Sequence, residues 1–170
     1  DLSPDLTQYY TVSAYIGALA APDDAFGTYA TTGATVSIET EDGTPISAVT
    51  DSTGKFVLEK VPNGTYIATV TYKYGFTRTF TIIVDGADIE SDTMIGIVAC
   101  NWDGINSNIT TSDISTYALC INASVGSDNY DLGIDIDRSG AITASDMAVC
   151  AGFINYSASQ IDYAEVVLTF

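Results

Sequence analysis

The chain has 170 residues, 46% of them hydrophobic, which predicts a packed core and excludes wholesale disorder. With 22 acidic and 5 basic residues, the net charge is −17 at pH 7, which excludes nucleic acid and anionic membrane surfaces as partners. Histidine is absent and no run of about 18 apolar residues occurs, which excludes imidazole-based catalysis, zinc chemistry and a membrane span.

Residues 1–95 have the pattern of short β-strands separated by turns. Segments rich in β-branched and aromatic residues are predicted to be strands; these are Tyr10–Ala20, Ala34–Thr40, Lys55–Val61, Thr65–Tyr74 and Arg78–Val84. Gly, Pro, Asn and Asp mark turns between them, at Glu41–Pro45, Asp51–Gly54, Pro62–Gly64 and Asp85–Asp88. Short strands at this spacing favour a β-sandwich, either immunoglobulin-like or transthyretin-like.

After about Met94 the pattern changes to two short amphipathic helices. Apolar residues recur at helical spacing in two segments, as Ile114, Tyr117, Ala118 and Ile121, and as Met147, Cys150, Ala151 and Ile154. Ile109–Ser124 aligns with Ile142–Ser157 at an offset of 33, and eight of 16 positions are identical. This repeat predicts a duplicated loop–helix unit in which each copy covers the apolar face of the other.

The loop before the second helix has the spacing of a calcium loop. Oxygen-bearing groups occupy positions 1, 3, 5 and 12, with a backbone carbonyl at 7; the ligands are Asp135, Asp137, Ser139, Asp146 and the carbonyl of Ala141. Gly140 lies at position 6, where this loop makes a sharp turn, and all the donors are oxygen. Hard oxygen ligands in this order predict Ca²⁺ rather than a soft metal.

The loop before the first helix has the same order with one extra residue near Gly104. Its predicted ligands are Asn101, Asp103, Asn106, the carbonyl of Asn108, and Asp113. Because it offers two carboxylates where the second loop offers three, we expect two Ca²⁺ sites, of which the first is the weaker.

Paired loop–helix units with Asp at position 12 resemble a dockerin over residues 97–160, and most closely the divergent dockerins of ruminococcal type. Dockerins are calcium-binding, non-catalytic modules that dock onto cohesins in cellulosomes, which degrade polysaccharides. The resemblance implies partner contacts at loop positions 10 and 11 and on the exposed helix faces; these are Thr111, Ser112, Thr116, Leu119, Ala123, Ala144, Ser145, Val149, Phe153 and Tyr156.

Thr35–Val70 resembles a carboxypeptidase regulatory-like or Cna-B-like sandwich through its turn and core residues, namely Thr50, Asp51, Gly54, Phe56, Pro62, Gly64 and Tyr66. A sandwich ahead of a dockerin resembles the X-module of an X-module–dockerin pair, which stabilises the dockerin. The expected architecture is therefore two domains: an all-β sandwich over residues 1–95 and an all-α dockerin with two EF-hand-like calcium loops over 96–170. The implied protein is secreted, located in the cellulosome or on a bacterial cell surface, and a monomer before it docks.

Two other function classes remain open at this point. A calcium-stabilised carbohydrate-binding or cell-surface adhesion module is the alternative, since 11 tyrosines and Trp102 offer aromatic surfaces. An enzyme is not expected, because nearly every clustered acid is already assigned as a metal ligand. The apolar connector Asp92–Cys100 and the terminal segment Glu165–Phe170 predict close packing between the halves, with the last segment forming a strand.

Overall fold

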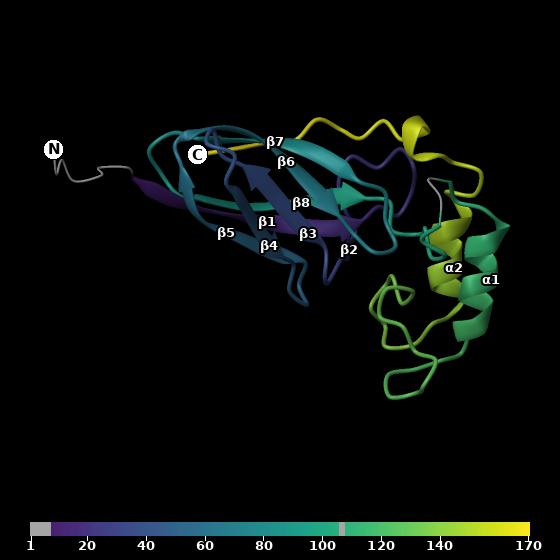
Figure 1. The fold of residues 1–170 in the computed structure, drawn as a ribbon. Coiled ribbons are helices and arrows are strands. Elements are labelled where there is room, and N and C mark those ends of the chain that lie inside the picture. The colour runs from purple at the N-terminus through teal and green to yellow at the C-terminus, as the bar shows by residue number, and fades with distance from the viewer. Residues whose placement is uncertain (1–7, 106–107) are drawn as a thin grey trace, which may run out of the picture.

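The computed structural model describes residues 8–105 and 108–170 and shows two facing sheets with helices at one end (Figure 1). In the first sheet β1 (Tyr9–Ala18) pairs antiparallel with β2 (Tyr29–Ala30) and β5 (Lys55–Pro62), and parallel with β8 (Ile89–Ile97). The second sheet has the order β4-β3-β6-β7-β9; its strands are β3 (Thr35–Glu39), β4 (Pro45–Val49), β6 (Gly64–Thr71), β7 (Arg78–Val84) and β9 (Val167–Thr169). The helices are α1 (Thr111–Cys120) and α2 (Ala144–Ala151), followed by a short 3-10 turn at Ala158–Gln160.

The sandwich core follows from the alternation of side chains along each strand. In β6, Tyr66, Ala68 and Val70 are buried while Ile67 between them is exposed. Phe56 from β5 and Phe80 from β7 meet between the two sheets with ring centroids 6.2 Å apart. The predicted strands at 34–40, 55–61, 65–74 and 78–84 correspond to β3, β5, β6 and β7, and the strand preferred at Tyr10–Ala20 corresponds to β1.

The expectation of two domains, one of them all-α, is wrong. The structure is a mostly β fold in which the described residues form two short helices, and no separate all-α C-terminal domain exists among them. The chain returns after α2 to add β9 beside β7, with Val167 opposite Thr81, so its last strand belongs to the sandwich (Figure 1). The boundary expected between residues 95 and 96 falls inside β8, and buried side chains of both regions form one continuous core.

The segment interpreted as an apolar connector is mostly a strand. Residues 92–97 lie in β8, which pairs in parallel with β1, and Val98, Ala99 and Cys100 continue from it into the buried core. The C-terminal strand that the sequence predicted is present as β9. Arg78, the first residue of β7, is 2% exposed and donates hydrogen bonds to the carbonyls of Gly96 and Ala164. One guanidinium therefore joins β7, β8 and the segment that leads into β9.

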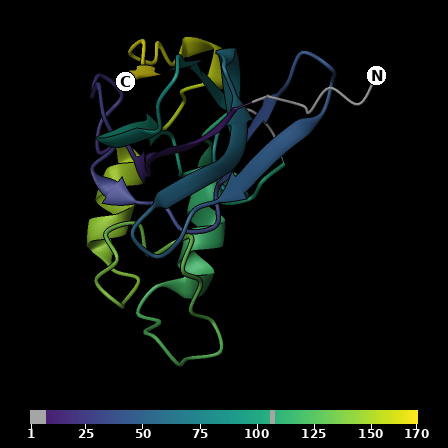
Figure 2. The same cartoon turned by 90° about the vertical axis from the view of Figure 1, so that its left-hand side faces the viewer.

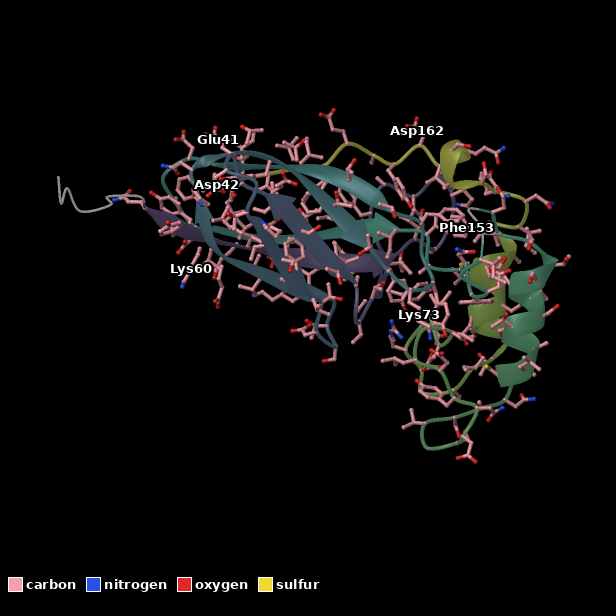
Figure 3. All side chains as sticks on the ribbon, viewed as in Figure 1. Glu41, Asp42, Lys60, Lys73, Phe153 and Asp162 are labelled. Atoms are coloured by element: carbon pink, nitrogen blue, oxygen red, sulfur yellow. The ribbon has the colours of Figure 1, made fainter. Side chains whose placement is uncertain are left out.

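A second set of contacts joins the sandwich to the loops at the helical end. Lys73, in the β6–β7 connection, lies at the end of the sandwich that faces those loops (Figure 3) and forms a 3.7 Å ion pair with Asp131. The Tyr74 hydroxyl donates to the same carboxylate at 2.5 Å. Arg138 Nε donates to the carbonyl of Ala30 at 2.9 Å. The helical end is therefore held to the sandwich through its loops as well as through β9.

Candidate metal centre at the helical end

Each helix begins with the same capping arrangement, which positions one carboxylate at the end of each loop. Thr110 and Thr143 are the N-caps, and their backbone N–H groups donate to Asp113 Oδ2 at 2.7 Å and Asp146 Oδ2 at 2.8 Å. Both aspartates are fully buried. The last predicted ligand of each loop is therefore fixed by local helix-capping chemistry.

The other oxygen of each capping aspartate closes its loop in the same way. Asp113 Oδ1 accepts a hydrogen bond from the Asp103 N–H at 3.1 Å, and Asp146 Oδ1 accepts one from the Asp137 N–H at 3.2 Å. Asp103 and Asp137 were both assigned to position 3 from the sequence. The equivalent hydrogen bonds agree with that alignment, including the extra residue in the first loop.

The second loop brings three carboxylates together. Ligand oxygens of Asp135, Asp137 and Asp146 all lie within 4.8 Å of one another, the one such acidic group among the described residues. Asp135 is buried and accepts hydrogen bonds from the N–H groups of Ser139 and Gly140 and from the Tyr130 hydroxyl. Gly140 has φ +88°, which permits the turn expected at position 6.

Electrostatics in this loop favour a bound cation. Burial raises the pKa of Asp146, and the charges of Asp137 and Asp135 raise it further. Arg138 lies in the same loop, but its guanidinium donates to the backbone carbonyls of Ala30, Leu132 and Asp135. Three crowded carboxylates without a cationic side chain hydrogen-bonded to them fit a hard divalent ion.

The first loop is less acidic but has an unpaired buried oxygen. Asn101 Oδ1 is buried without a hydrogen-bond partner among the described residues, at the position that the alignment assigns to the first ligand. A buried amide oxygen without a partner is unfavourable, so its position fits a metal ligand. Asn106 lies outside the described residues, while Asn108 is exposed and forms a bridge with Ser157.

The two units are joined by reciprocal backbone pairing. Ile109 N–H donates to the carbonyl of Tyr156, beyond α2, and Ile142 N–H donates to that of Ala123, beyond α1. The bridges Asn108–Ser157 and Ser124–Ala141 continue this exchange. Each loop is therefore paired with the segment that follows the other helix, and α1 and α2 lie side by side (Figure 2).

The structure divides the predicted partner-binding residues into two groups. Thr111, Ser112, Leu119, Ala144 and Ser145 are exposed, and Thr116 and Tyr156 are half-buried. The placement of Ala123, Val149 and Phe153 on a partner-facing surface is wrong, because all three are buried; Figure 3 labels Phe153 above α2.

For Val149 and Phe153, the reason for this error is the direction of the capping aspartate Asp146. Asp146 points into the loop, so the residues three, four and seven positions later share its buried face; these are Val149, Cys150 and Phe153. The apolar stripe predicted to start at Met147 is therefore rotated by one residue.

The exposed apolar surface around the end of α1 was only partly identified. Leu119 is 77% exposed as predicted, but Ile121, assigned to the core from its spacing, is 44% exposed, and Val125 is 70% exposed. Ile121 leaves the helical register because α1 ends at Cys120 and the backbone turns to ψ 138°. Trp102 was considered as a sugar-binding surface, but it is buried and stacks on Tyr117 with centroids 5.6 Å apart.

Comparisons with known proteins point to cellulosomes, although no protein-family model matches the chain. Over 124 residues the chain is 29% identical to Cellulosomal-scaffolding protein B of Acetivibrio thermocellus and to Cellulosomal-scaffolding protein A of a strain of that species. A solved chain from a type II Cohesin-X-Dockerin complex of Acetivibrio cellulolyticus, a C-terminal interface mutant, superposes with a TM-score of 0.62 at 30% identity. That match covers 88% of this chain and 98% of the solved one.

The chain belongs with the proteins of cellulosomal cohesin–X–dockerin complexes. A second such structure, an N-terminal interface mutant, gives a TM-score of 0.60 at 29% identity over the same coverage. The prediction that the chain is not an enzyme is confirmed by its relatives, which are cellulosomal scaffolding proteins. The chain spans only 16% and 7% of the length of those two proteins. Among the described residues, no helix has the length and apolar character needed to cross a membrane.

Proposed function

We propose that this chain is a non-catalytic, calcium-dependent interaction module of an extracellular cellulosome, and that its helical end docks onto a cohesin. The observation that carries the proposal is the pair of equivalent loop–helix units, each ending in a buried capping aspartate whose second oxygen accepts a hydrogen bond from its own loop. Helix capping explains one oxygen of Asp113 and of Asp146, and a bound cation would compensate for burying the charge of each carboxylate.

Calcium would connect the loops to the docking surface. In the second loop Asp135, Asp137 and Asp146 would supply carboxylates, Ser139 a hydroxyl and Ala141 a carbonyl; in the first loop Asn101, Asp103 and Asp113 would supply side-chain oxygens. When bound, the ion supplies positive charge that holds these oxygens together. Because the helices begin directly at the loops, the ion would set the orientation of both helices.

The exposed residues of α1 form the proposed contact surface. Thr111 and Ser112 lie at its start, and Leu119, Ile121 and Val125 lie at and beyond its end. Leu119 and Val125 are more than two-thirds exposed, and large exposed apolar side chains grouped together are typical of interaction surfaces. Asp113 is the one charged residue in α1, and it is buried, so a contact through this helix would be apolar and hydroxyl-rich rather than ionic.

The sandwich would keep the docking end rigid. It contacts the helical end through the Lys73–Asp131 pair, the Arg138–Ala30 hydrogen bond and strand β9. The extra residue in the first loop makes the two units unequal, which favours a single docking orientation over two related by rotation.

A second candidate role is that of the receiving partner in the same kind of complex. The chain is mostly β, and the solved complexes that it resembles contain a cohesin, so a sandwich that receives a dockerin is the alternative. Paired oxygen-rich loops are not needed by a sandwich that only receives a partner. We therefore assign the docking role to the chain and retain the receiving role as an outcome of the test.

The experiment is capture of the purified chain on two panels, one of immobilised cohesins and one of immobilised dockerins, with Ca²⁺ and with chelator. We expect capture by at least one cohesin in Ca²⁺ and its loss in chelator. Capture by a dockerin through the sandwich, with no response to chelator, would contradict the proposal and favour the receiving role. A glycan array run beside the panels tests the adhesion alternative.

A further inference from the structure

The sandwich carries a cavity at the end remote from α1 and α2. Its volume is about 680 Å³. Its walls come from β1, the β3–β4 turn, β5 and the β5–β6 turn, and they mix one aromatic ring with charged and amide groups; these include Tyr9, Glu41, Asp42, Glu59, Lys60 and Asn63. Figure 3 labels Glu41, Asp42 and Lys60 at the end of the ribbon opposite the helices. None of these residues belongs to the loops or to the proposed contact surface of α1, so the proposed function leaves the cavity unexplained.

A β-bulge aims two consecutive side chains at this cavity. The pairing of β5 with β1 shifts register between Tyr10 and Val12, so Glu59 and Lys60 of β5 together oppose one residue of β1. Lys60 has φ +57°, a left-handed conformation that a residue with a β-carbon rarely adopts. Consecutive side chains of a regular strand point to opposite faces, whereas here both line the same cavity. The bulge therefore brings an acid and a base to one wall.

Hydrogen bonds fix the polar groups of the two turns. Asp42 Oδ1 accepts from the Thr40 hydroxyl at 2.5 Å and from the Thr44 N–H at 3.0 Å. The hydrogen bond from Thr40 lowers the pKa of Asp42, so this carboxylate stays ionised at neutral pH. Asn63 Oδ1 accepts from the Gly86 N–H at 2.8 Å. Both turns thus hold their polar side chains in place before any ligand binds, which reduces the entropy lost on binding.

A second hollow extends the cavity along the sandwich. Its volume is about 420 Å³, and it shares Ile46 and Glu59 with the first. Strand β4 ends one sheet and β5 ends the other, so the two hollows together form a trough along the open side of the sandwich. Val49 and Val57, both exposed, line the second hollow. The five residues of β4 span roughly 16 Å, which suits an extended chain better than a compact molecule.

We propose that this trough binds a linear, uncharged oligosaccharide with β-1,4 linkages. Tyr9 is 53% exposed and offers a ring face on which a sugar ring can stack. Sugar hydroxyls donate hydrogen bonds to carboxylates, which Glu41, Asp42 and Glu59 supply. The ammonium group of Lys60 donates to the same kind of hydroxyl. Because a β-1,4-linked chain is extended, successive rings reach groups spaced along the trough.

Two other ligand classes fit the trough less well. A metal ion needs crowded carboxylates, but among the described residues only the second calcium loop brings three acids within 4.8 Å of one another. A peptide would add as a strand to β4 or β5 through backbone hydrogen bonds. Pro45 in β4 has no N–H, and the bulge at Glu59 and Lys60 distorts β5, so both edges disfavour such an addition.

The test is calorimetric titration of the full chain with soluble β-1,4-linked hexaoses of glucose, xylose and mannose, in Ca²⁺ and in chelator. We expect at least one hexaose to bind, with equal affinity in both conditions, because the trough contains none of the predicted calcium ligands. Tyr9→Ala and Glu59→Gln should each weaken that binding by about tenfold, through loss of stacking and of a charged acceptor.

Matched controls change similar side chains outside the trough. Phe26→Ala removes a ring that is 55% exposed and lies beyond the other end of β1 from Tyr9. Glu90→Gln changes an exposed acid in β8, which pairs with β1 on the side opposite β5. Both controls should bind as the unaltered chain does. The trough variants and the controls should all keep the melting temperature, because each replaces an exposed side chain.

Absence of binding by all three hexaoses at millimolar concentration would overturn the proposal, as would binding that survives both Tyr9→Ala and Glu59→Gln. Tighter binding of an oligolysine peptide than of any hexaose, weakened by Glu59→Gln, would also overturn it and assign the trough to a basic peptide. Saccharide binding is measured without a cohesin and does not require calcium, so failure of this proposal and failure of the proposed function are distinguishable.

Discussion

The sandwich and the helical end of this molecule are stabilised by different means. The sandwich buries alternating apolar side chains between two sheets, and Phe56 meets Phe80 across them. The helical end has two short helices and buries the carboxylates of Asp113, Asp135 and Asp146. Buried acids weaken a fold unless hydrogen bonds or a positive charge compensate them, so the proposed calcium would stabilise the helical end and not the sandwich.

The largest expected effect comes from removing calcium, which tests this comparison directly. In chelator we expect hydrogen exchange to accelerate in α1 and α2 by orders of magnitude and to stay slow in β1 and β6. Trp102, the single tryptophan, is buried against Tyr117 at the start of the first loop, so its emission should shift to longer wavelength. Unchanged exchange and emission would show that the helical end does not depend on calcium.

Removal of β9 is the next largest perturbation, and it tests how the two regions are joined. Ending the chain after Glu165 removes Val166 and Leu168, both buried, and we expect a loss of about 3–5 kcal/mol of stability. Denaturant unfolding should change from one transition to two, because the returning strand no longer connects the regions.

The matched control removes only Phe170, which is 86% exposed, and should leave the unfolding midpoint unchanged. A single transition in the chain without β9 would show that the Lys73–Asp131 and Arg138–Ala30 contacts are sufficient to join the regions.

Exchanging the position-1 side chains of the two loops tests the predicted ranking of their calcium affinities. Position 1 is Asn101 in the first loop and Asp135 in the second, so Asn101→Asp should raise the calcium affinity of the first loop by about tenfold, and Asp135→Asn should lower that of the second by a similar factor. Calcium titration by calorimetry measures both.

Asp162→Asn, on the exposed returning segment (Figure 3), removes one negative charge outside the loops as Asp135→Asn does inside one, and it should leave both affinities unaltered. Tighter binding in the first loop than in the second of the unaltered chain would contradict the ranking.

The smallest expected effect concerns the surface of α1. Leu119→Asp should weaken cohesin binding by about tenfold without changing the melting temperature, because Leu119 is 77% exposed and contributes little to the core. Val49→Asp, which changes a 63% exposed residue of β4 in the sandwich, is the matched control and should bind normally. Equal binding by both variants would remove Leu119 from the proposed contact surface.

Local chemistry explains what the sequence predicted well. The alignment of the two loops and most of the strands depend on residues close together in the chain, and the structure agrees with both. The capping role of Asp113 and Asp146 was not predicted. The extra residue in the first loop was also placed consistently with the structure, since Asp103 and Asp137, both assigned to position 3, make equivalent hydrogen bonds.

Contacts between distant residues explain what was missed. Strand β8 lacks alternation, and it becomes a strand through parallel pairing with β1 far earlier in the chain. Strand β9 pairs with β7 over a similar separation in sequence. The prediction of a separate all-α domain failed because it did not account for this return of the chain to the sandwich. Val149 and Phe153 were placed on the wrong face because helical spacing is compatible with several rotations, and the direction of Asp146 selects one.

Calorimetric titration of the chain into a type II cohesin, with saturating Ca²⁺ and then with chelator, tests the central claim most directly. We predict one binding event per chain in Ca²⁺ and loss of measurable heat in chelator, with the sandwich still folded by circular dichroism. Equal affinity in both conditions would contradict the account, because docking would then not require the calcium-bound loops.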